Sequence, residues 1–536
     1  MYSKKTPHAP PISRGGACNN CKRRKMRCDG RTPICGPCIK TPSLGDCEYA
    51  DIGRTHADRL QEQISILETR LGELQNRSDV NNSITLHNPY ALNALSSSSR
   101  HRLAEKDLME AFLPYASHLS FFLNGRNLVN MFSNPRSEFA ERPTIALSSS
   151  MVLIGAYFRH HVSQNPNITS ELVEGYLSKA IQTTSVGLSE SHPHQILHTI
   201  QSHILIAQYF FLLRRALEGK WHLNKAVSLV LSARMHRIRS SLVLQNVPAT
   251  SAIHATTWLP AAQNTSEEVE QINAMWNVLA MNCLWSAMEG VPASIAYTTD
   301  QGRVDTPWPL DTDNYSNATF PPNLQSSHTL QKFLAGFPDE GYSILALYVK
   351  AAVLFEQTTM FWKRYSNNAQ AQALTRSLEF HGSYRTLYNL LTDLLNKIPP
   401  IRGPHEAKTR LLVIHTLVRV AIIRLQCTLG ADNPSNQSSF LDMANGIIEC
   451  LGKIDLDSTV FLDPIMAVIL RAPATIFIRA IKLFRSPTIR NAAELQKYSD
   501  GLNQLMHILA RYSMGNPLMA LKSGEIQGEY ESELSH

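Results

Sequence analysis

The sequence predicts a mainly α-helical protein with three parts: a small cysteine-rich module, a short coiled coil and a large all-helical domain. Six of the nine cysteines fall between residues 18 and 47. A seven-residue repeat of apolar side chains follows them. From residue 101 onward, apolar residues recur at helical spacing, and Gly and Pro are confined to the separators. Together these observations indicate the fold class.

The N-terminal residues 1–17 are rich in Lys, Pro, Ser and Gly, so we expect them to be disordered. The chain opens with Met-Tyr-Ser-Lys-Lys and shows no apolar signal segment. An oxidising compartment is therefore not indicated, and a disulfide framework explains the clustered cysteines poorly. A thiol redox pair fits less well still, because no βαβ pattern surrounds the cysteines.

The clustered cysteines repeat one pattern twice. In each half a C-x2-C pair is followed by a third cysteine, after six residues in the first half and eight in the second. A C-x2-C turn offers two thiolates to a tetrahedral metal, and six cysteines can serve two zinc ions if two of them bridge. So short a module, residues 18–48, has too few apolar side chains to fold without metal. The sequence therefore predicts two Zn²⁺ ions, with these ligands: Cys18, Cys21, Cys28, Cys35, Cys38 and Cys47.

Basic side chains crowd the segment between the second and third cysteines. From Arg14 to Lys40 there are eight basic residues and one acidic residue, Asp29, so this window carries the whole chain's net charge of +7. Such a cluster repels itself unless an acidic partner is present, and phosphate is the obvious one. The segment thus predicts contacts to double-stranded DNA by Lys22, Arg23, Arg24, Lys25 and Arg27. A zinc ribbon that contacts RNA or protein is the alternative.

These residues resemble the fungal binuclear zinc cluster (Zn2Cys6) transcription factors. That family's pattern of C-x2-C-x6-C, a short proline-containing loop, C-x2-C and a last cysteine is matched throughout, with Pro33 in the loop. The resemblance implies that Cys18 and Cys35 bridge, that Cys21 and Cys28 complete one zinc site, and that Cys38 and Cys47 complete the other. It also implies that Arg24 and Lys25 enter the major groove and read a CGG triplet, where their side chains can bond guanine O6 and N7. The second half, with Lys40, would be the supporting half.

A coiled coil is predicted for residues 56–77, because apolar side chains alternate at spacings of three and four. The dimerisation residues of this seam are Leu60, Ile64, Leu67, Leu71 and Leu74. It predicts a homodimer that ties two zinc modules side by side, as the resemblance also implies. A single amphipathic helix packed on the main domain is the alternative. Residues 78–100 form a polar, Ser-rich stretch that we expect to be a disordered linker.

Residues 101–512 predict one large all-helical domain. We expect helices over 103–112, 145–158, 196–217, 221–235, 269–288, 343–362, 382–395, 405–429, 440–451, 465–484 and 492–512. The separators 240–265, 296–330 and 430–438 are polar and predict surface loops. Arginines interrupt the most apolar runs, for example Arg419 and Arg471, so these runs predict core helices rather than membrane spans.

Part of this domain, about residues 105–300, resembles the fungal regulatory domain that accompanies the zinc cluster. The likeness rests on Pro114 with its Phe121-Phe122 neighbourhood, on 214–237 with the break Glu218-Gly219-Lys220-Trp221, and on 276–292, which ends Glu-Gly-Val-Pro. Asn273 and Ala274 replace a basic pair that is usual before Trp276, and Asn282 stands where aspartate is common. These departures count against a shared ligand contact there, not against the fold.

Catalytic signatures are absent from the sequence. There is no G-x-S-x-G, no Gly-rich phosphate loop, no H-E-x-x-H and no acid-base pair of carboxylates at helical spacing, so the protein is predicted not to be an enzyme. His160 and His161 fit a helix-capping role. Cys283, Cys427 and Cys450 lie in apolar helices and fit buried structural thiols. The acidic tail, 513–536, fits a solvated terminus, with an activation segment as the alternative.

The sequence as a whole thus predicts a nuclear, sequence-specific DNA-binding regulator of RNA polymerase II transcription that acts as a homodimer. A small-molecule inducer and the transcription machinery are further partners that such a regulator would take, and no membrane is expected. The alternative function is a metabolite-sensing helical receptor whose zinc module binds RNA or protein rather than duplex DNA.

Overall fold

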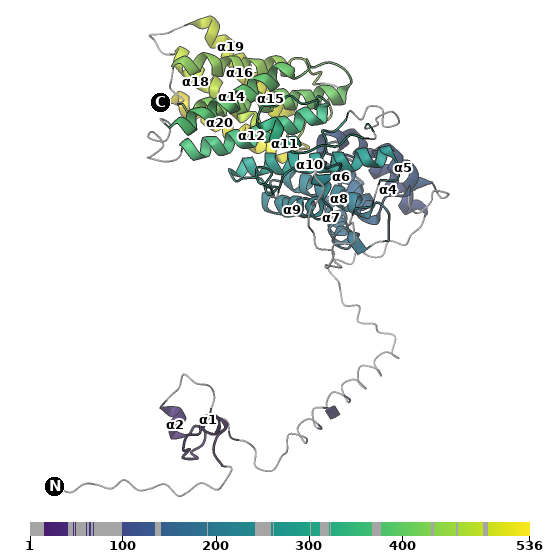
Figure 1. The fold of residues 1–536 in the computed structure, drawn as a ribbon, viewed down its shortest axis with the longest axis vertical. Coiled ribbons are helices and arrows are strands. Elements are labelled where there is room, and N and C mark those ends of the chain that lie inside the picture. Colours follow the sequence, from purple (N-terminus) through teal and green to yellow (C-terminus); the bar gives the residue numbers. More distant parts are fainter. Residues whose placement is uncertain are drawn as a thin grey trace, which may run out of the picture. The chain divides into compact units, whose positions relative to one another are not determined.

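The chain divides into two compact units, residues 1–88 and 89–536 (Figure 1). The computed structural model describes residues 16–40, 47, 49, 61, 64–65, 68, 99–134, 141–189, 191–241, 259–260, 262–300, 302–310, 321, 323–366, 377–429, 434–456, 459–485 and 491–535, with backbone alone for 99–104, 434–436 and 534–535. Residues 1–15 of the expected disordered N-terminus, residues 78–98 of the expected linker and most of the coiled coil lie outside the described residues.

Within residues 16–40, the first unit contains two short helices, α1 (Asn19–Arg23) and α2 (Gly36–Ile39), which contact each other. The buried side chains that cluster in it are four cysteines, Cys18, Cys21, Cys28 and Cys35, and Ala17 and Tyr49 pack against them. No aliphatic core supports the described part of this unit, which agrees with a fold that depends on metal.

In the part of the chain that the structure describes, the second unit begins with seven α-helices and several short 3-10 helices. They are α4 (Ser99–Phe112), η2 (Leu113–Leu119), α5 (Gly125–Ser133), α6 (Ile145–His161), α7 (Ser170–Ser185), η4 (Gly187–Ser189), α8 (Gln195–Leu212), α9 (Ala216–Ser232), η5 (Met235–Arg237) and α10 (Thr265–Glu289). Helix α6 packs against α4, α7 and α8, and α9 packs against α8 and α10.

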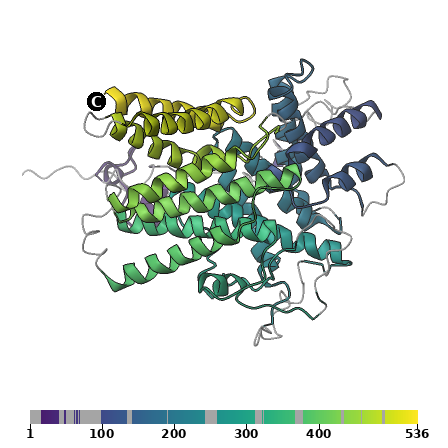
Figure 2. The same ribbon diagram turned by 90° about the horizontal axis from the view of Figure 1, so that it is seen from above.

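The rest of the second unit is helical as well. It contains α11 (Thr329–Leu334), α12 (Ile344–Ser366), α14 (Leu378–Lys397), α15 (His405–Cys427), α16 (Pro434–Leu451), α17 (Met466–Ile469), α18 (Arg471–Arg485), α19 (Ala492–Arg511) and α20 (Pro517–Ser535). Helix α12 packs against both α10 and α15 and so joins the two halves of the unit. Figure 2 shows the yellow C-terminal helices lying beside the green ones, in accord with the contacts of α18 with α16, α19 and α20.

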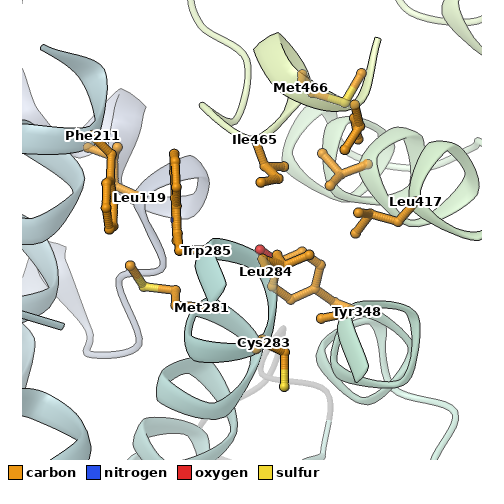
Figure 3. Packing of buried hydrophobic residues seen from close by; sticks show 14 of the residues in the cluster. Leu119, Phe211, Met281, Cys283, Leu284, Trp285, Tyr348, Leu417, Ile465 and Met466 are labelled. Atoms are coloured by element: carbon orange, nitrogen blue, oxygen red, sulfur yellow. The ribbon is translucent and has the colours of Figure 1, made fainter. Parts of the chain in front are cut away.

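One continuous hydrophobic core runs through both halves of this unit. Within the first half, Phe211 of α8 stacks on Trp285 of α10 with ring centroids 3.7 Å apart. On the other side of α10, Tyr348 of α12 faces Leu417 and Ile465 of the second half (Figure 3). Because the two halves share this core, residues 89–536 form one domain rather than two.

Several helices begin or end at residues that cap them. The Asn264 side chain accepts the Glu267 N–H and starts α10, and Gly290, with φ of 65°, ends it. The Thr144 side chain likewise accepts the Leu147 N–H at the start of α6. These are the residue types that favour helix ends.

The mainly α-helical fold class is confirmed. In the part of the chain that the structure describes, β structure is limited to one isolated bridge, between Ser240 and Ser326. Among the described helices, α12 is long and apolar enough to cross a membrane, but 78% of its most apolar window is buried inside the protein. Its packing against α10 and α15 is that of a core helix.

Several expected boundaries were wrong. The helix expected over 196–217 ends at Leu212, and the break falls at 213–215, where Arg214 has a φ of 64°. The Glu218-Gly219-Lys220-Trp221 segment therefore lies inside α9 rather than at the break. The helix expected over 465–484 is divided between α17 and α18 at Leu470.

Two expected surface loops also differ. Helix α16 already begins at Pro434, inside the separator expected at 430–438. Within the separator at 296–330, Val304, Asp305 and Thr306 are fully buried. Asp305 accounts for this burial, since it binds Arg237 at 2.7 Å, Arg303 at 3.0 Å and the His328 N–H at 2.8 Å.

The C-terminal tail is the largest difference from expectation. Residues 517–535 form helix α20, which packs against α18 and α19. Leu518, Met519 and Ile526 are buried, so a solvated terminus was the wrong interpretation of these residues. Burial of this apolar face explains why the segment is helical.

Candidate metal centre and nucleic-acid interface

Helices α1 and α2 each begin at a cysteine. Cys18 precedes α1, and its Sγ accepts the N–H of Cys21 at 3.4 Å. Cys35 precedes α2, with Pro37 in the first turn of that helix. Each helix carries the second cysteine of its C-x2-C pair one turn in, so both sulfur atoms of a pair point the same way. The sequence repeat is thus a structural repeat.

The six predicted ligands lie together in two overlapping groups. Within each group all sulfur atoms lie within 4.8 Å of one another, and Cys18 and Cys35 belong to both groups. The first group is Cys18, Cys21, Cys28 and Cys35, and the second is Cys18, Cys35, Cys38 and Cys47.

The sulfur spacing fits tetrahedral zinc. Cys18 Sγ lies 3.7 Å from Cys35 Sγ and 3.8 Å from Cys38 Sγ. Cys21 Sγ lies 3.7 Å from Cys35 Sγ. A zinc–sulfur bond of about 2.3 Å requires tetrahedral sulfur atoms about 3.8 Å apart. The spacing and the all-thiol donor set are therefore those of a zinc centre.

Burial makes so many thiolates costly without a cation. Cys18 and Cys35 are fully buried, and Cys21 is 1% exposed. Burial raises the pKa of Cys21 to about 12 and also raises the pKa of Cys35. At Cys18, burial opposes ionisation, but hydrogen bonds led by the Cys21 N–H lower the pKa to about 6. A bound metal would supply the positive charge that the remaining thiolates need.

Further side chains hold the loops around the cluster. The Asp29 carboxylate accepts the Gly36 N–H at 2.9 and 3.1 Å, at the start of α2. A Cβ at Gly36 would lie 2.5 Å from Asp29 Oδ2, so a larger residue at this position would displace the Asp29 carboxylate. Tyr49 Oη donates to the Arg31 carbonyl at 2.9 Å and lies 3.7 Å from Cys28 Sγ.

Asp29, Gly36 and Tyr49 were not predicted as site residues. The one signal for Asp29 was its position as the lone acidic residue among eight basic ones. The loop between Asp29 and Gly36 also contains the cis peptide bond Thr32–Pro33.

The five basic residues lie on α1 and on the turn that follows it. Lys22 and Arg23 belong to α1, and Arg24 caps it. Lys22, Arg23, Lys25 and Arg27 are exposed, and Arg24 is half-buried. These cations surround the C-terminal end of the helix, where the helix dipole favours positive charge.

The turn after α1 has a defined geometry. Lys25 has a φ of 54°, its N–H donates to the Lys22 carbonyl at 3.1 Å, and the Met26 N–H donates to the Cys21 carbonyl at 3.0 Å. These two bonds form a Schellman motif, whose left-handed position is usually glycine. The turn begins at Cys21, so the metal cluster and the basic surface share one piece of backbone.

The other expected site residues fall into two sets. Of the predicted dimerisation residues, Leu60, Leu67, Leu71 and Leu74 lie outside the described residues, while Ile64 is helical and 49% exposed. In the helical unit, Cys283 and Cys450 are buried and Cys427 is half-buried, and burial raises the pKa of all three.

His160 and His161 lie in the last turn of α6, as expected. His160 Nδ1 contacts the Ile168 carbonyl at 2.6 Å, which ties the end of α6 to the loop that follows it.

Comparison with known proteins agrees with this geometry. Residues 16–55 match the fungal Zn(2)-Cys(6) binuclear cluster domain family. Two fungal proteins, the citrinin biosynthesis transcriptional activators mrl3 of Monascus ruber and ctnR of Monascus purpureus, are each 38% identical to the chain over 63 residues. The alignments cover 11% of this chain and only 12% and 11% of those relatives. No solved structure matches the chain. The protein thus carries a fungal Zn(2)-Cys(6) binuclear cluster domain and is similar, through that region, to fungal transcriptional activators.

Proposed function

We propose that the protein is a nuclear, sequence-specific DNA-binding transcription factor that reads CGG-type triplets as a homodimer. The observation that carries this proposal is the placement of five basic residues on α1 and its C-terminal turn, both anchored on the cysteine cluster. The relatives named above are transcriptional activators, and a DNA-binding activator acts in the nucleus. The same basic cluster would also suit nuclear import.

Two zinc ions would be held by the two groups of sulfur atoms, with Cys18 and Cys35 shared. When bound, they supply the folding free energy that this unit lacks. The ions have no catalytic part in this proposal. The chain's own contribution is to start α1 at Cys18 and to end it at the turn after Arg24, so that the basic side chains are presented on a rigid element.

On DNA, the exposed Lys22, Arg23 and Arg27 would contact phosphates and position the module. Arg24 and Lys25 would reach base edges in the major groove. Residues 56–77 would pair two modules, and the linker between cluster and coiled coil would set the spacing of two half-sites. The helical unit would receive regulatory signals or recruit the transcription machinery.

The decisive experiment is selection of random duplex DNA by the zinc-loaded full-length protein at physiological salt. Two enriched CGG-like triplets at fixed spacing would support both the function and the dimer. One triplet alone would contradict the obligate dimer. No enrichment from a protein with confirmed zinc content would contradict the proposal and favour RNA or protein as the partner.

A single substitution tests base reading. Lys25→Ala should weaken binding to the selected site by about 1–3 kcal/mol and leave binding to scrambled DNA almost unchanged, because a base contact carries the specificity. Lys40→Ala removes the same charge from the supporting half, so it should weaken binding to both DNAs equally. Gel shifts with both DNAs measure the difference. Equal weakening by Lys25→Ala would make Lys25 a phosphate contact.

A further inference from the structure

Helix α9 exposes two bulky apolar side chains to solvent. Leu217 is 81% exposed and Trp221 is 53% exposed. They are four residues apart, so they are neighbours on one face of the helix. Single exposed apolar residues are common on protein surfaces, but a neighbouring pair that includes a tryptophan is typical of a binding surface. Together with Arg214, Lys220 and Lys225, the pair forms what we call the α9 surface.

The opposite face of α9 is packed against the rest of the helical unit. Its buried residues are Gly219, His222, Leu223, Ala226, Val227 and Val230. They lie against α8 and α10, which are the neighbours of α9 (Figure 1). A Cβ at Gly219 would lie 2.5 Å from Phe211 Cε1, so the helix approaches α8 closely at this point. The exposed pair therefore belongs to a rigid element, and a partner would lose little free energy in ordering it.

The segment that contains the pair is positively charged. Residues 214–225 include four basic residues and only one acidic residue, Glu218, which gives a net charge of +3. Residues 14–40 already carry the whole chain's net charge of +7, so the rest of the chain is neutral as a whole. The positive charge of the α9 surface is therefore a local concentration.

The acidic side chains next to the α9 surface are already engaged. Arg215 pairs with Glu218 at 2.8 Å, and Lys220 pairs with Glu289 of α10 at 2.5 Å. Lys225 Nζ lies 5.0 Å from the centroid of the Trp221 ring. Within the described part of the chain, neither Lys225 nor Arg214 forms an ion pair. Two cations beside the apolar pair are thus left for a partner.

These features restrict the chemistry of an occupant. An apolar pair flanked by unpaired cations is complementary to a peptide that carries bulky apolar side chains among acidic ones. The same surface on a second copy of the chain fits poorly, because two positively charged surfaces repel each other. Single-stranded nucleic acid could stack on Trp221, but the aliphatic Leu217 offers no stacking surface.

We propose that the α9 surface binds an acidic, amphipathic peptide segment of a partner protein. An apolar side chain of that segment packs against Leu217 and Trp221, and its carboxylates lie beside Arg214 and Lys225. Because Lys225 lies over the Trp221 ring, its ammonium group can meet a carboxylate at the edge of the apolar contact. This interaction goes beyond the proposed DNA recognition and does not depend on it.

A displayed library of random dodecapeptides tests the proposal. The target is the zinc-loaded full-length protein, and peptides that also bind the Trp221→Ala protein are removed. We expect the retained peptides to combine Asp or Glu with Leu, Phe or Trp. A library without any enrichment that depends on Trp221, or enrichment of peptides that lack acidic residues, would overturn the proposal.

Matched variants then locate the most enriched peptide, whose binding is followed by fluorescence anisotropy of a labelled copy. Leu217→Ala should weaken binding about fivefold, and Lys225→Glu about tenfold or more. Leu378→Ala removes a leucine of α14 that is 91% exposed, and should leave the affinity unchanged. Lys497→Glu reverses a lysine that lies over the Tyr498 ring of α19, and it should also have no effect.

Further controls separate folding from binding. Thermal melting checks that each variant folds, and Lys225→Gln, which should still weaken binding, replaces Lys225→Glu if the latter lowers the midpoint. Sodium chloride should weaken binding, because it screens the charges. Equal affinities of the α9 variants and their controls, or an affinity that salt does not change, would place the peptide elsewhere and refute the site. Displacement of the peptide by an equal concentration of single-stranded DNA would make nucleic acid the occupant instead.

Discussion

Lys25 is proposed to contact DNA with its side chain, and its backbone has an unfavourable conformation. Its φ of 54° is a left-handed conformation, which costs a residue with a side chain about 1–2 kcal/mol relative to glycine. Lys25→Gly should therefore stabilise the zinc-loaded module by about 1 kcal/mol, while it weakens specific DNA binding as much as Lys25→Ala does. The stability is measured as the temperature at which zinc is released to a chromogenic chelator.

Arg27→Gly is the matched control, because Arg27 is not among the residues with positive φ. Glycine there should lower the release temperature. A lower release temperature for Lys25→Gly as well would mean that the Lys25 side chain stabilises the turn. The left-handed conformation of Lys25 would then not destabilise the module.

The His203–His222 pair gives the helical unit a sensitivity to acid. The two Nδ1 atoms lie 3.0 Å apart. Burial, together with nearby positive charge, lowers the pKa of His203 to about 3 and that of His222 to about 4. Both values lie below the unfolded value of about 6.5, so the stability gained from neutral imidazoles is complete above pH 6.5 and is lost as the pH falls toward 4.

We expect the free energy of urea unfolding, followed by tryptophan fluorescence, to fall between pH 6.5 and pH 5. His222→Asn should reduce that slope by about 1.4 kcal/mol per pH unit, the effect of one proton. His381→Asn, on the exposed side of α14, should leave the slope unchanged. An unchanged slope for His222→Asn would show that His222 is already protonated in the folded state.

At the candidate site, the cysteines could be predicted from the sequence and their supports could not. C-x2-C spacing is local, so the pattern itself indicates the donor set. Asp29 contacts Gly36 seven residues away, and Tyr49 contacts Arg31 eighteen residues away. Such contacts leave no periodic pattern in the sequence, because they depend on the folded conformation of the loop. They could therefore not be predicted from the sequence.

Among the helices, the packing of α20 can be tested directly by substitution. Ile526 is fully buried, while Arg471 pairs with Glu525 at 3.2 Å and Lys482 pairs with Glu533 at 2.7 Å. Ile526→Asp loses the apolar burial and places a charge in the core, so it should cost more than about 3 kcal/mol in urea unfolding. Gly524→Asp, at an exposed helical position with nothing within 4 Å, should be neutral or slightly stabilising. Similar effects of both variants would mean that α20 is not packed in solution.

The elements that the sequence predicted well are those with long apolar runs. Helices α6, α10, α12 and α15 bury most of their residues, and their periodicity is strong. Helices α7 and α20 were missed because polar residues dominate them, and α20 also contains Gly524 and Gly528, which lower helix propensity. Both are helical because one apolar face packs on neighbours, which depends on the tertiary structure.

At the scale of the whole molecule, the two units have separate interiors. The cysteine cluster and the large hydrophobic core share no residues. All six tryptophans follow residue 220, in the helical unit. Chelation of zinc with EDTA should therefore abolish DNA binding and leave the tryptophan emission and thermal midpoint of the helical unit unchanged. A parallel loss of the tryptophan signal would show that the helical unit depends on the zinc module.

The sharing of Cys18 and Cys35 also determines how the metal would load. An ion bound to the first group of sulfur atoms holds both shared thiolates in place, and these are half of the second group. The second ion then meets a partly assembled site, so its affinity should exceed that of the first. Native mass spectrometry at substoichiometric zinc should accordingly find empty and doubly loaded protein with little singly loaded species. Such all-or-none loading would make the module a threshold responder to zinc supply.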